Sequence, residues 1–212
     1  MSEFFSTDGP LFRLLTDVTT LFILNVCTLI CCLPVVTAGA ALSSLNYMIM
    51  KMRDGEDGHL VKRYFKEFKV NLKGSTPVWL IFLVLSAVLY VDYFYLAYGD
   101  PGSKWLIPLF VMIILMAAVF VWAFPILARF ENTFGASVKN IFIYVLAYLP
   151  RTIIQMVIYI VVVFLFTQVT AMFPLIFVCG LSLPAYLCSF IYYPVIQDAI
   201  KKIQGEDEEG SS

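Results

Sequence analysis

Cysteine side chains are the first candidates for metal or redox chemistry in this sequence. Cys27 and Cys31 stand four residues apart, so on a helix they share one face and could ligate a metal ion as a pair. No histidine or carboxylate neighbours them, and every cysteine lies in an apolar stretch, which favours a role as small packing residues. We therefore expect neither a metal site nor a disulfide framework. The five cysteines are Cys27, Cys31, Cys32, Cys179 and Cys188.

Acidic and imidazole side chains meet in the segment 53–59, RDGEDGH. Its carboxylates suggest calcium, but the twelfth position counted from Asp54 is Phe65, where an EF-hand loop carries glutamate. His59, the only histidine, has no identifiable acid–base partner, so we expect it to lie solvated at a helix start. The chain also lacks the HExxH, DxD and GxSxG motifs. We predict no catalytic residue, no cofactor and no enzymatic activity.

Positive charge gathers on one side of the segment 59–73. On a helix, its apolar residues fall within a sector of about 140° and its basic residues lie opposite. This pattern predicts an amphipathic helix in the cytoplasmic membrane interface, with its aromatic side towards lipid. We expect its charges to bind an anionic lipid leaflet rather than nucleic acid. The basic residues are Lys62, Arg63, Lys66, Lys69 and Lys73.

The composition places these residues in a membrane protein. Of 212 residues, 61% are apolar and 14% are charged, against about 45–50% and about 25% in soluble domains. We expect one integral membrane domain over residues 1–203, followed by a disordered acidic tail over residues 204–212.

Hydrophobic runs predict an all-α, polytopic membrane helical bundle. We expect residues 74–77, GSTP, to change the direction of the chain. The second helix is short for a membrane span, so we expect residues 34–37 to supply the rest of the membrane depth as irregular backbone packed against protein. Two cytoplasmic-interface amphipathic helices are expected over 59–73 and 137–149. Six membrane helices are expected over residues 11–33, 38–52, 77–98, 104–130, 152–172 and 175–200.

The distribution of lysine and arginine predicts the orientation. With both termini cytoplasmic, all of the 14 Lys and Arg residues except Lys104 lie inside. This topology corresponds to a multi-pass protein of the plasma membrane. In an alternative, the helices over 11–33 and 38–52 form one re-entrant unit, which would place the N-terminus outside.

Small and polar residues on the short second helix predict a helix-packing surface. Gly39 and Ser43 form a small-xxx-small pair that lets backbones approach closely, inside the chain or towards a partner. Thr37 and Asn46 flank this face and could donate hydrogen bonds across it. Ala41 points away from it, so we expect leucine there to be tolerated better than at Gly39.

Several segments resemble the YesL-like family, bacterial membrane proteins of uncharacterised molecular function. They are LPVVTAG over 33–39, FKEFKVNLKGS over 65–75 and PILARF over 125–130, followed by Lys139-Asn140 and Pro150. Members of that family are often encoded beside carbohydrate uptake systems of the ABC type. The resemblance therefore implies an accessory role near sugar import, with permease subunits as partners, and it supplies no catalytic residues.

Two functions remain open from the sequence. A membrane enzyme is a third and disfavoured alternative, because no catalytic motif is present. The first is a non-enzymatic protein accessory to a membrane complex. The alternative is a small autonomous transporter, because helices interrupted by Pro and Gly, here near 34–39 and 180–184, build substrate sites in transporters. Asp17 and Asp92 are the acids nearest the membrane interior, and both are expected near an interface, whereas coupled carriers place ionisable groups deeper.

Overall fold

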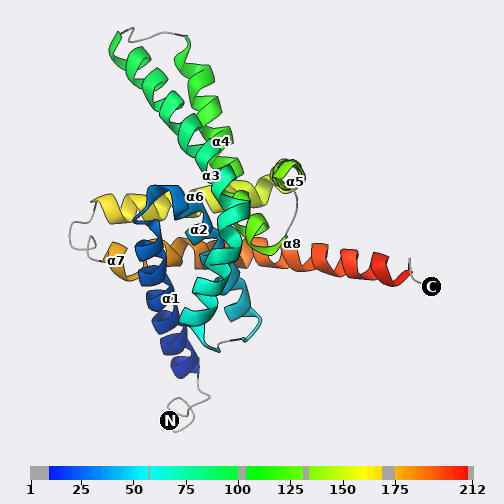
Figure 1. Cartoon of the computed structure of the whole chain (residues 1–212). Helices are drawn as coiled ribbons and strands as arrows, with labels where there is room; N and C mark the ends of the chain where they lie inside the picture. Colours follow the sequence, from blue (N-terminus) through cyan, green and yellow to red (C-terminus); the bar gives the residue numbers. More distant parts are fainter. Residues whose placement is uncertain (1–9, 57, 100–103, 131–133, 169–174, 210–212) are drawn as a thin grey trace.

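The computed structural model describes residues 10–56, 58–99, 104–130, 134–168 and 175–209. The described residues contain helices and no strand (Figure 1), so the all-α prediction is confirmed. The helices are α1 (Pro10–Cys32), the 3-10 turn η2 (Val35–Thr37), α2 (Ala38–Arg53), α3 (Leu60–Gly99), α4 (Leu106–Arg129), α5 (Phe134–Ala147), α6 (Leu149–Gln168), α7 (Leu175–Cys179) and α8 (Ser182–Glu209).

Four of the described helices are long and apolar enough to cross a membrane: α1, α3, α4 and α6. The chain is therefore a multi-pass helical membrane protein. The other two predicted membrane helices take different forms. The short one, α2, has 16 residues and is almost wholly buried, and the last one is divided by a break into α7 and α8.

Helix α2 is the centre of the fold. It packs against α1, α3, α4 and α8, and one of the two apolar clusters of the core, formed with α1 and Tyr64 of α3, is built on its Ala41, Leu45, Met48 and Ile49. Alanine, glycine and serine fill its first half, and these small side chains let several neighbours approach its backbone at once. Ala41 is fully buried, so leucine there would also have to displace neighbouring side chains.

Helix α3 is continuous over 40 residues, about 60 Å in length, and includes Pro77 in its interior. The prediction that residues 74–77 re-aim the chain is therefore wrong. A proline inside a membrane helix is tolerated when neighbouring groups satisfy the freed backbone atoms. The amphipathic segment and the membrane segment are two halves of one helix.

Part of the apolar side of the N-terminal half of α3 faces protein. Tyr64 is fully buried, and Leu60 and Phe68 pack beside it against the cluster formed by α1 and α2, whereas Val61 and Phe65 are exposed. The predicted contact with lipid is therefore wrong for Tyr64 and stays a prediction for Val61 and Phe65. The amphipathic pattern reports that one side of a helix is apolar, and here α1 and α2 supply the apolar surface that covers it.

The elements are not arranged as parallel rods. In Figure 1, α6 and α8 run across α1, and the α3–α4 hairpin extends away from the rest of the chain. Helices α6 and α8 pack against each other. The second amphipathic helix, α5, packs mainly on α4 through Ser137, Ile141 and Val145.

Two other expectations need correction. The η2 turn does not bury its side chains in protein, since Val35 and Val36 are exposed. Helix α8 continues to Glu209, nine residues beyond the predicted helix end at residue 200 and into the predicted tail of 204–212. Residues 210–212 of that tail, and the predicted end of the helix over 152–172, lie outside the described residues.

Candidate functional site

Gly39 lies at a tight contact between two helices. A Cβ atom added there would lie 2.4 Å from Cβ of Trp79 and 3.0 Å from the carbonyl oxygen of Ser75, both on α3. One turn further along α2, the buried hydroxyls of Ser43 and Ser75 are 2.7 Å apart and share a hydrogen bond. Glycine and serine therefore let α2 and α3 touch backbone to backbone.

Polar contacts continue along this interface. The Asn71 amide donates to Oγ of Ser44 at 3.3 Å, and the Tyr64 hydroxyl donates to the carbonyl of Ala41 at 3.2 Å. These contacts satisfy polar groups that are buried in the protein, where an unpaired group is costly. We call this surface the α2–α3 seam: Gly39, Ala41, Ser43 and Ser44 of α2 with Tyr64, Asn71, Ser75 and Trp79 of α3.

The other two residues predicted for the packing face have separate roles. The Asn46 amide oxygen accepts from the Tyr192 hydroxyl at 3.0 Å, so Asn46 joins α2 to α8. Thr37 does not reach across the face. Its hydroxyl lies 2.8 Å from the carbonyl of Cys31 and 2.9 Å from that of Pro34, and it caps the end of α1. The face is used inside the chain, so it is not available to a partner.

The break between α7 and α8 is closed by Asn25 of α1, which is fully buried. Its amide oxygen accepts from the backbone N–H groups of Leu181 at 2.9 Å and Ser182 at 3.2 Å. Its amide nitrogen donates to the carbonyl of Phe177 at 2.8 Å. Asn25 therefore faces another helix, and the sequence did not reveal that its target is a helix break.

The first interruption, at η2, is closed in a similar way. The indole N–H of Trp79 donates to the carbonyl of Val35 at 2.6 Å. Trp79 lies near the middle of α3. Its position beside Gly39 shows that one side chain both packs on the seam and satisfies the irregular backbone.

The predicted basic strip lies on the N-terminal half of α3. Arg63 differs from the others because it pairs with Glu56 at 2.7 Å, in the turn that precedes α3. Lys62 and Lys73 are eleven residues apart, which corresponds to about 16 Å along a helix. The exposed members are Lys62, Lys66, Lys69 and Lys73.

Glu56 links the end of α2 to the start of α3 through two ion pairs. Its carboxylate is 2.8 Å from the Lys51 ammonium at the end of α2 and 2.7 Å from the Arg63 guanidinium at the start of α3. Hydrogen bonds from Lys51 and Arg63 lower the pKa of this carboxyl group. The group is solvent-exposed, so each pair contributes little to stability.

Arg53 and Asp54, at the end of α2, contact α8 in a way that the sequence did not suggest. The guanidinium of Arg53 lies 4.1 Å from the ring centre of Phe190. The Asp54 carboxylate accepts hydrogen bonds from the Tyr193 hydroxyl and, at 3.2 Å, from the Gln197 amide. An adjacent Arg–Asp pair after a helix was the available signal, but no pattern indicated which helix it would meet.

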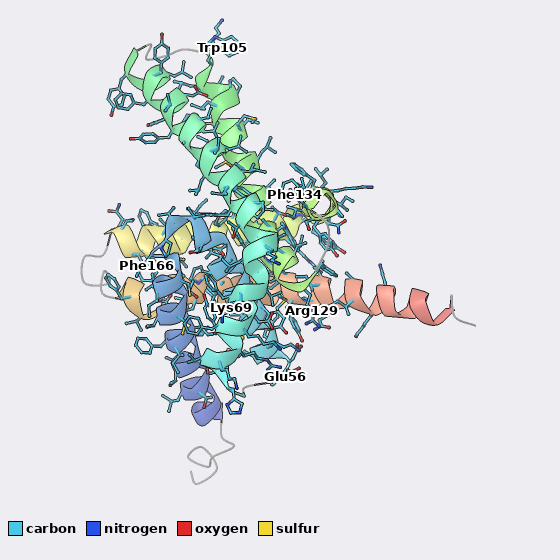
Figure 2. The ribbon with its side chains drawn as sticks, in the orientation of Figure 1. Glu56, Lys69, Trp105, Arg129, Phe134 and Phe166 are labelled. Atoms are coloured by element: carbon cyan, nitrogen blue, oxygen red, sulfur yellow. The ribbon has the colours of Figure 1, made fainter. Side chains whose placement is uncertain are left out.

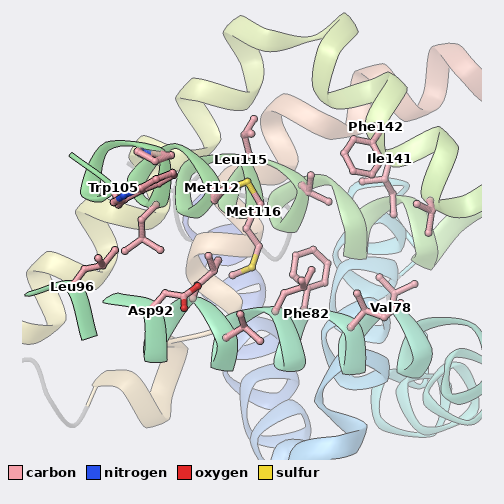
Figure 3. Close-up of a pocket in the computed structure, with 18 of the residues that line it drawn as sticks. Val78, Phe82, Asp92, Leu96, Trp105, Met112, Leu115, Met116, Ile141 and Phe142 are labelled. Atoms are coloured by element: carbon pink, nitrogen blue, oxygen red, sulfur yellow. The ribbon is translucent and has the colours of Figure 1, made fainter. Parts of the chain in front are cut away.

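An apolar groove of about 900 Å³ runs between α3, α4 and α5 (Figure 3). Asp92, Leu96 and Trp105 lie at one end of it, and Val78 and Ile141 lie at the other. Figure 2 places Trp105 at the opposite end of the hairpin from Lys69 and Glu56. Among the described residues that line the groove, Asp92 is the one carboxylate.

The described residues form no catalytic arrangement that we can identify. No group of three His, Cys, Asp or Glu side chains in this part of the chain is close enough to hold a metal ion. The cysteines in it are free thiols.

Among protein families, residues 18–93 match the model of a family described as a protein of unknown function, DUF624. This stretch includes every residue of the α2–α3 seam and Asn25. No match was found among curated proteins or among solved structures.

Proposed function

We propose that this protein is a non-enzymatic integral membrane protein that docks on a larger membrane complex, such as a carbohydrate uptake system of the ABC type. The α3–α4 hairpin is the proposed docking element. The observation that carries this proposal is the lack of protein cover over the apolar half of α3. In the most apolar window of α3, 6% of residues are buried, against 39% in that of α1.

The outer face of α3, on the side away from α4, is the surface that a partner would meet. It consists of Leu80, Val84, Val91 and Tyr98, which are all exposed and lie one or two turns apart. Lipid can cover such a face, and association in membranes depends on packing rather than on a hydrophobic force. The apolar half of α3, which its own chain leaves almost uncovered, is suited to packing against the helices of a permease.

The two helix interruptions support this role over that of a carrier. In transporters, interrupted helices offer unpaired backbone groups to the substrate. Here Asn25 binds the backbone groups of the α7–α8 break, and Trp79 binds the carbonyl of Val35. The chain itself therefore occupies backbone groups that a carrier would leave for its cargo.

The proposed orientation follows from charge. The lysines of α3 precede its apolar half and Lys104 follows it, so both termini and the lysine strip are proposed to be cytoplasmic in the plasma membrane. The resemblance to the YesL-like family supports permease subunits as the partner.

Affinity purification in mild detergent tests this function, using the wild type, Val91→Trp and Val163→Trp. Both valines are exposed on apolar helices, with exposed fractions of 64% and 58%, but Val163 lies on α6. Each tryptophan adds bulk without adding charge. We expect a permease subunit to accompany the wild type and Val163→Trp, and to be lost with Val91→Trp because the added ring keeps the helices apart.

A subunit that stays with both variants would contradict docking through the outer face of α3. Purification of the wild type without any partner, combined with substrate uptake by the reconstituted protein alone, would instead establish the carrier.

A further inference from the structure

The groove between α3, α4 and α5 has an amphiphilic pattern that the docking proposal does not use. Its apolar floor is formed by residues such as Phe82, Met112 and Met116, and its polar group, Asp92, lies towards one end (Figure 3). On α3 the lining residues run from Val78 to Leu96, which is about 27 Å. A groove of this length nearly matches the hydrocarbon thickness of about 30 Å.

The end that holds Asp92 has the composition of a cation site. Tyr95 lies on the same face of α3, three residues along, and Trp105 lines this end from the start of α4. A carboxylate attracts a cation, and the faces of Trp and Tyr rings bind ammonium groups in the same way. Tyr and Trp are also the residues that settle at the headgroup level of a bilayer.

We expect the carboxylate of Asp92 to pair with a cation. It lies seven residues, or about 10 Å, from the end of α3, next to apolar helix surface. Ionisable groups in membrane segments usually pair with another group. No ion pair with Asp92 is found among the described residues.

We propose that the groove binds a phospholipid whose headgroup carries an ammonium group. The ammonium lies at Asp92, Tyr95 and Trp105, and an acyl chain follows the groove towards Val78 and Ile141. A ligand with one cationic end and a long apolar body matches a groove whose charge lies towards one end. A basic helix from a partner protein is the competing occupant, and the test below separates the two.

Competition between two lipids tests the proposal on the full-length protein in detergent. The probes are phosphatidylethanolamine and a glucosyl diacylglycerol with the same acyl chains, and bound lipid is counted by native mass spectrometry. Both probes are uncharged overall, so the lysine strip of α3 does not favour an anionic lipid. We expect the wild type to retain several times more phosphatidylethanolamine than glucosyl lipid.

Four variants locate the site. Asp92→Asn should abolish the preference and Trp105→Leu should reduce it, whereas Asp198→Asn, an exposed acid on α8, should leave it unchanged. Met116→Trp fills the middle of the groove and should reduce the binding of both lipids. Because Asp92 is exposed, Asp92→Asn should keep the melting temperature of the wild type, which shows that the variant is folded.

Equal retention of the two lipids by the wild type, or an unchanged preference in Asp92→Asn, would overturn the proposal. A photoreactive residue in place of Leu96 gives a second readout in native membranes. Lipid adducts there support the lipid site, and protein adducts would assign the groove to a partner helix. Neither result depends on whether the outer face of α3 docks on a permease.

Discussion

At the scale of residues, the fold depends on a few side chains that bring α1, α3 and α8 onto α2. Gly39 allows the closest approach, and Asn25 satisfies a helix break from a neighbouring helix. Both residue types were recognisable in the sequence. Their partners were not, because the three-residue spacing of a small-xxx-small motif does not indicate which helix will lie on it.

Gly39→Ala and Gly39→Leu should both destabilise the protein. Even a methyl group would meet Cβ of Trp79, so α2 and α3 must separate, at a cost of about 1–3 kcal/mol for alanine and more for leucine. Gly74→Ala is the matched control, because a Cβ there has open space within α3 and should stabilise the helix by about 0.5–1 kcal/mol. Thermal unfolding in detergent measures both. Equal melting temperatures for Gly39→Ala and the wild type would show that the seam yields without cost.

Asn25→Ala should destabilise the α7–α8 break. It leaves two N–H groups and one carbonyl without their partner, and each buried unsatisfied group costs about 1–3 kcal/mol. Thr28→Ala is the control on the same helix, because its hydroxyl donates to the carbonyl of Leu24 within α1 and not to the α7–α8 break. We expect faster hydrogen exchange at Leu181 and Ser182 in Asn25→Ala alone. Unchanged exchange at those amides would refute the closure of the break by Asn25.

The Glu56 pairs predict a small dependence of stability on pH. Because the folded-state pKa of Glu56 lies below its usual value of about 4.3, its contribution is present above that pH and disappears as the pH falls through the folded-state pKa. The melting temperatures of the wild type and Glu56→Gln should therefore differ slightly at neutral pH and converge in acid. A constant difference down to strongly acid pH would show that Lys51 and Arg63 do not recognise the charge.

At the scale of elements, α3 is the main departure from the predicted arrangement. Helix starts and ends agreed closely with the hydrophobic runs in α1, α2 and α4. Residues 74–77 favour a turn in water, but a membrane helix has few alternatives to internal hydrogen bonding, so it continues through Pro77. The amphipathic pattern over 59–73 likewise could not distinguish lipid from the apolar surface of α1 and α2.

Continuity of α3 predicts unequal contact of its lysines with lipid. Lys73 lies next to the apolar half and Lys62 about 16 Å away, which exceeds a Debye length of about 8–10 Å. In nanodiscs containing anionic lipid at low salt, acylation should be slowed more at Lys73 than at Lys62. Added salt or neutral lipid should remove the difference. Equal protection of both lysines would favour a helix lying flat in the interface.

At the scale of the whole molecule, helices packed around α2 carry the α3–α4 hairpin, and the apolar half of α3 is scarcely covered by its own chain. The sequence predicted the apolar character of α3 and α4 well. It could not predict the lack of cover, because exposure of an apolar helix to lipid and its burial in protein have the same hydrophobic pattern. The helix breaks are closed by side chains of the chain itself, whereas the apolar half of α3 is left uncovered. This contrast is the physical basis of the proposed accessory role.

Photo-cross-linking from position 91 in native membranes tests that role most directly. A photoreactive residue in place of Val91 lies on the outer face of α3, and one in place of Val163 on α6 is its control. The account predicts a covalent adduct between position 91 and one permease polypeptide, with no such adduct from position 163. Lipid adducts alone from position 91, in membranes that contain the assembled uptake system, would contradict docking by the hairpin.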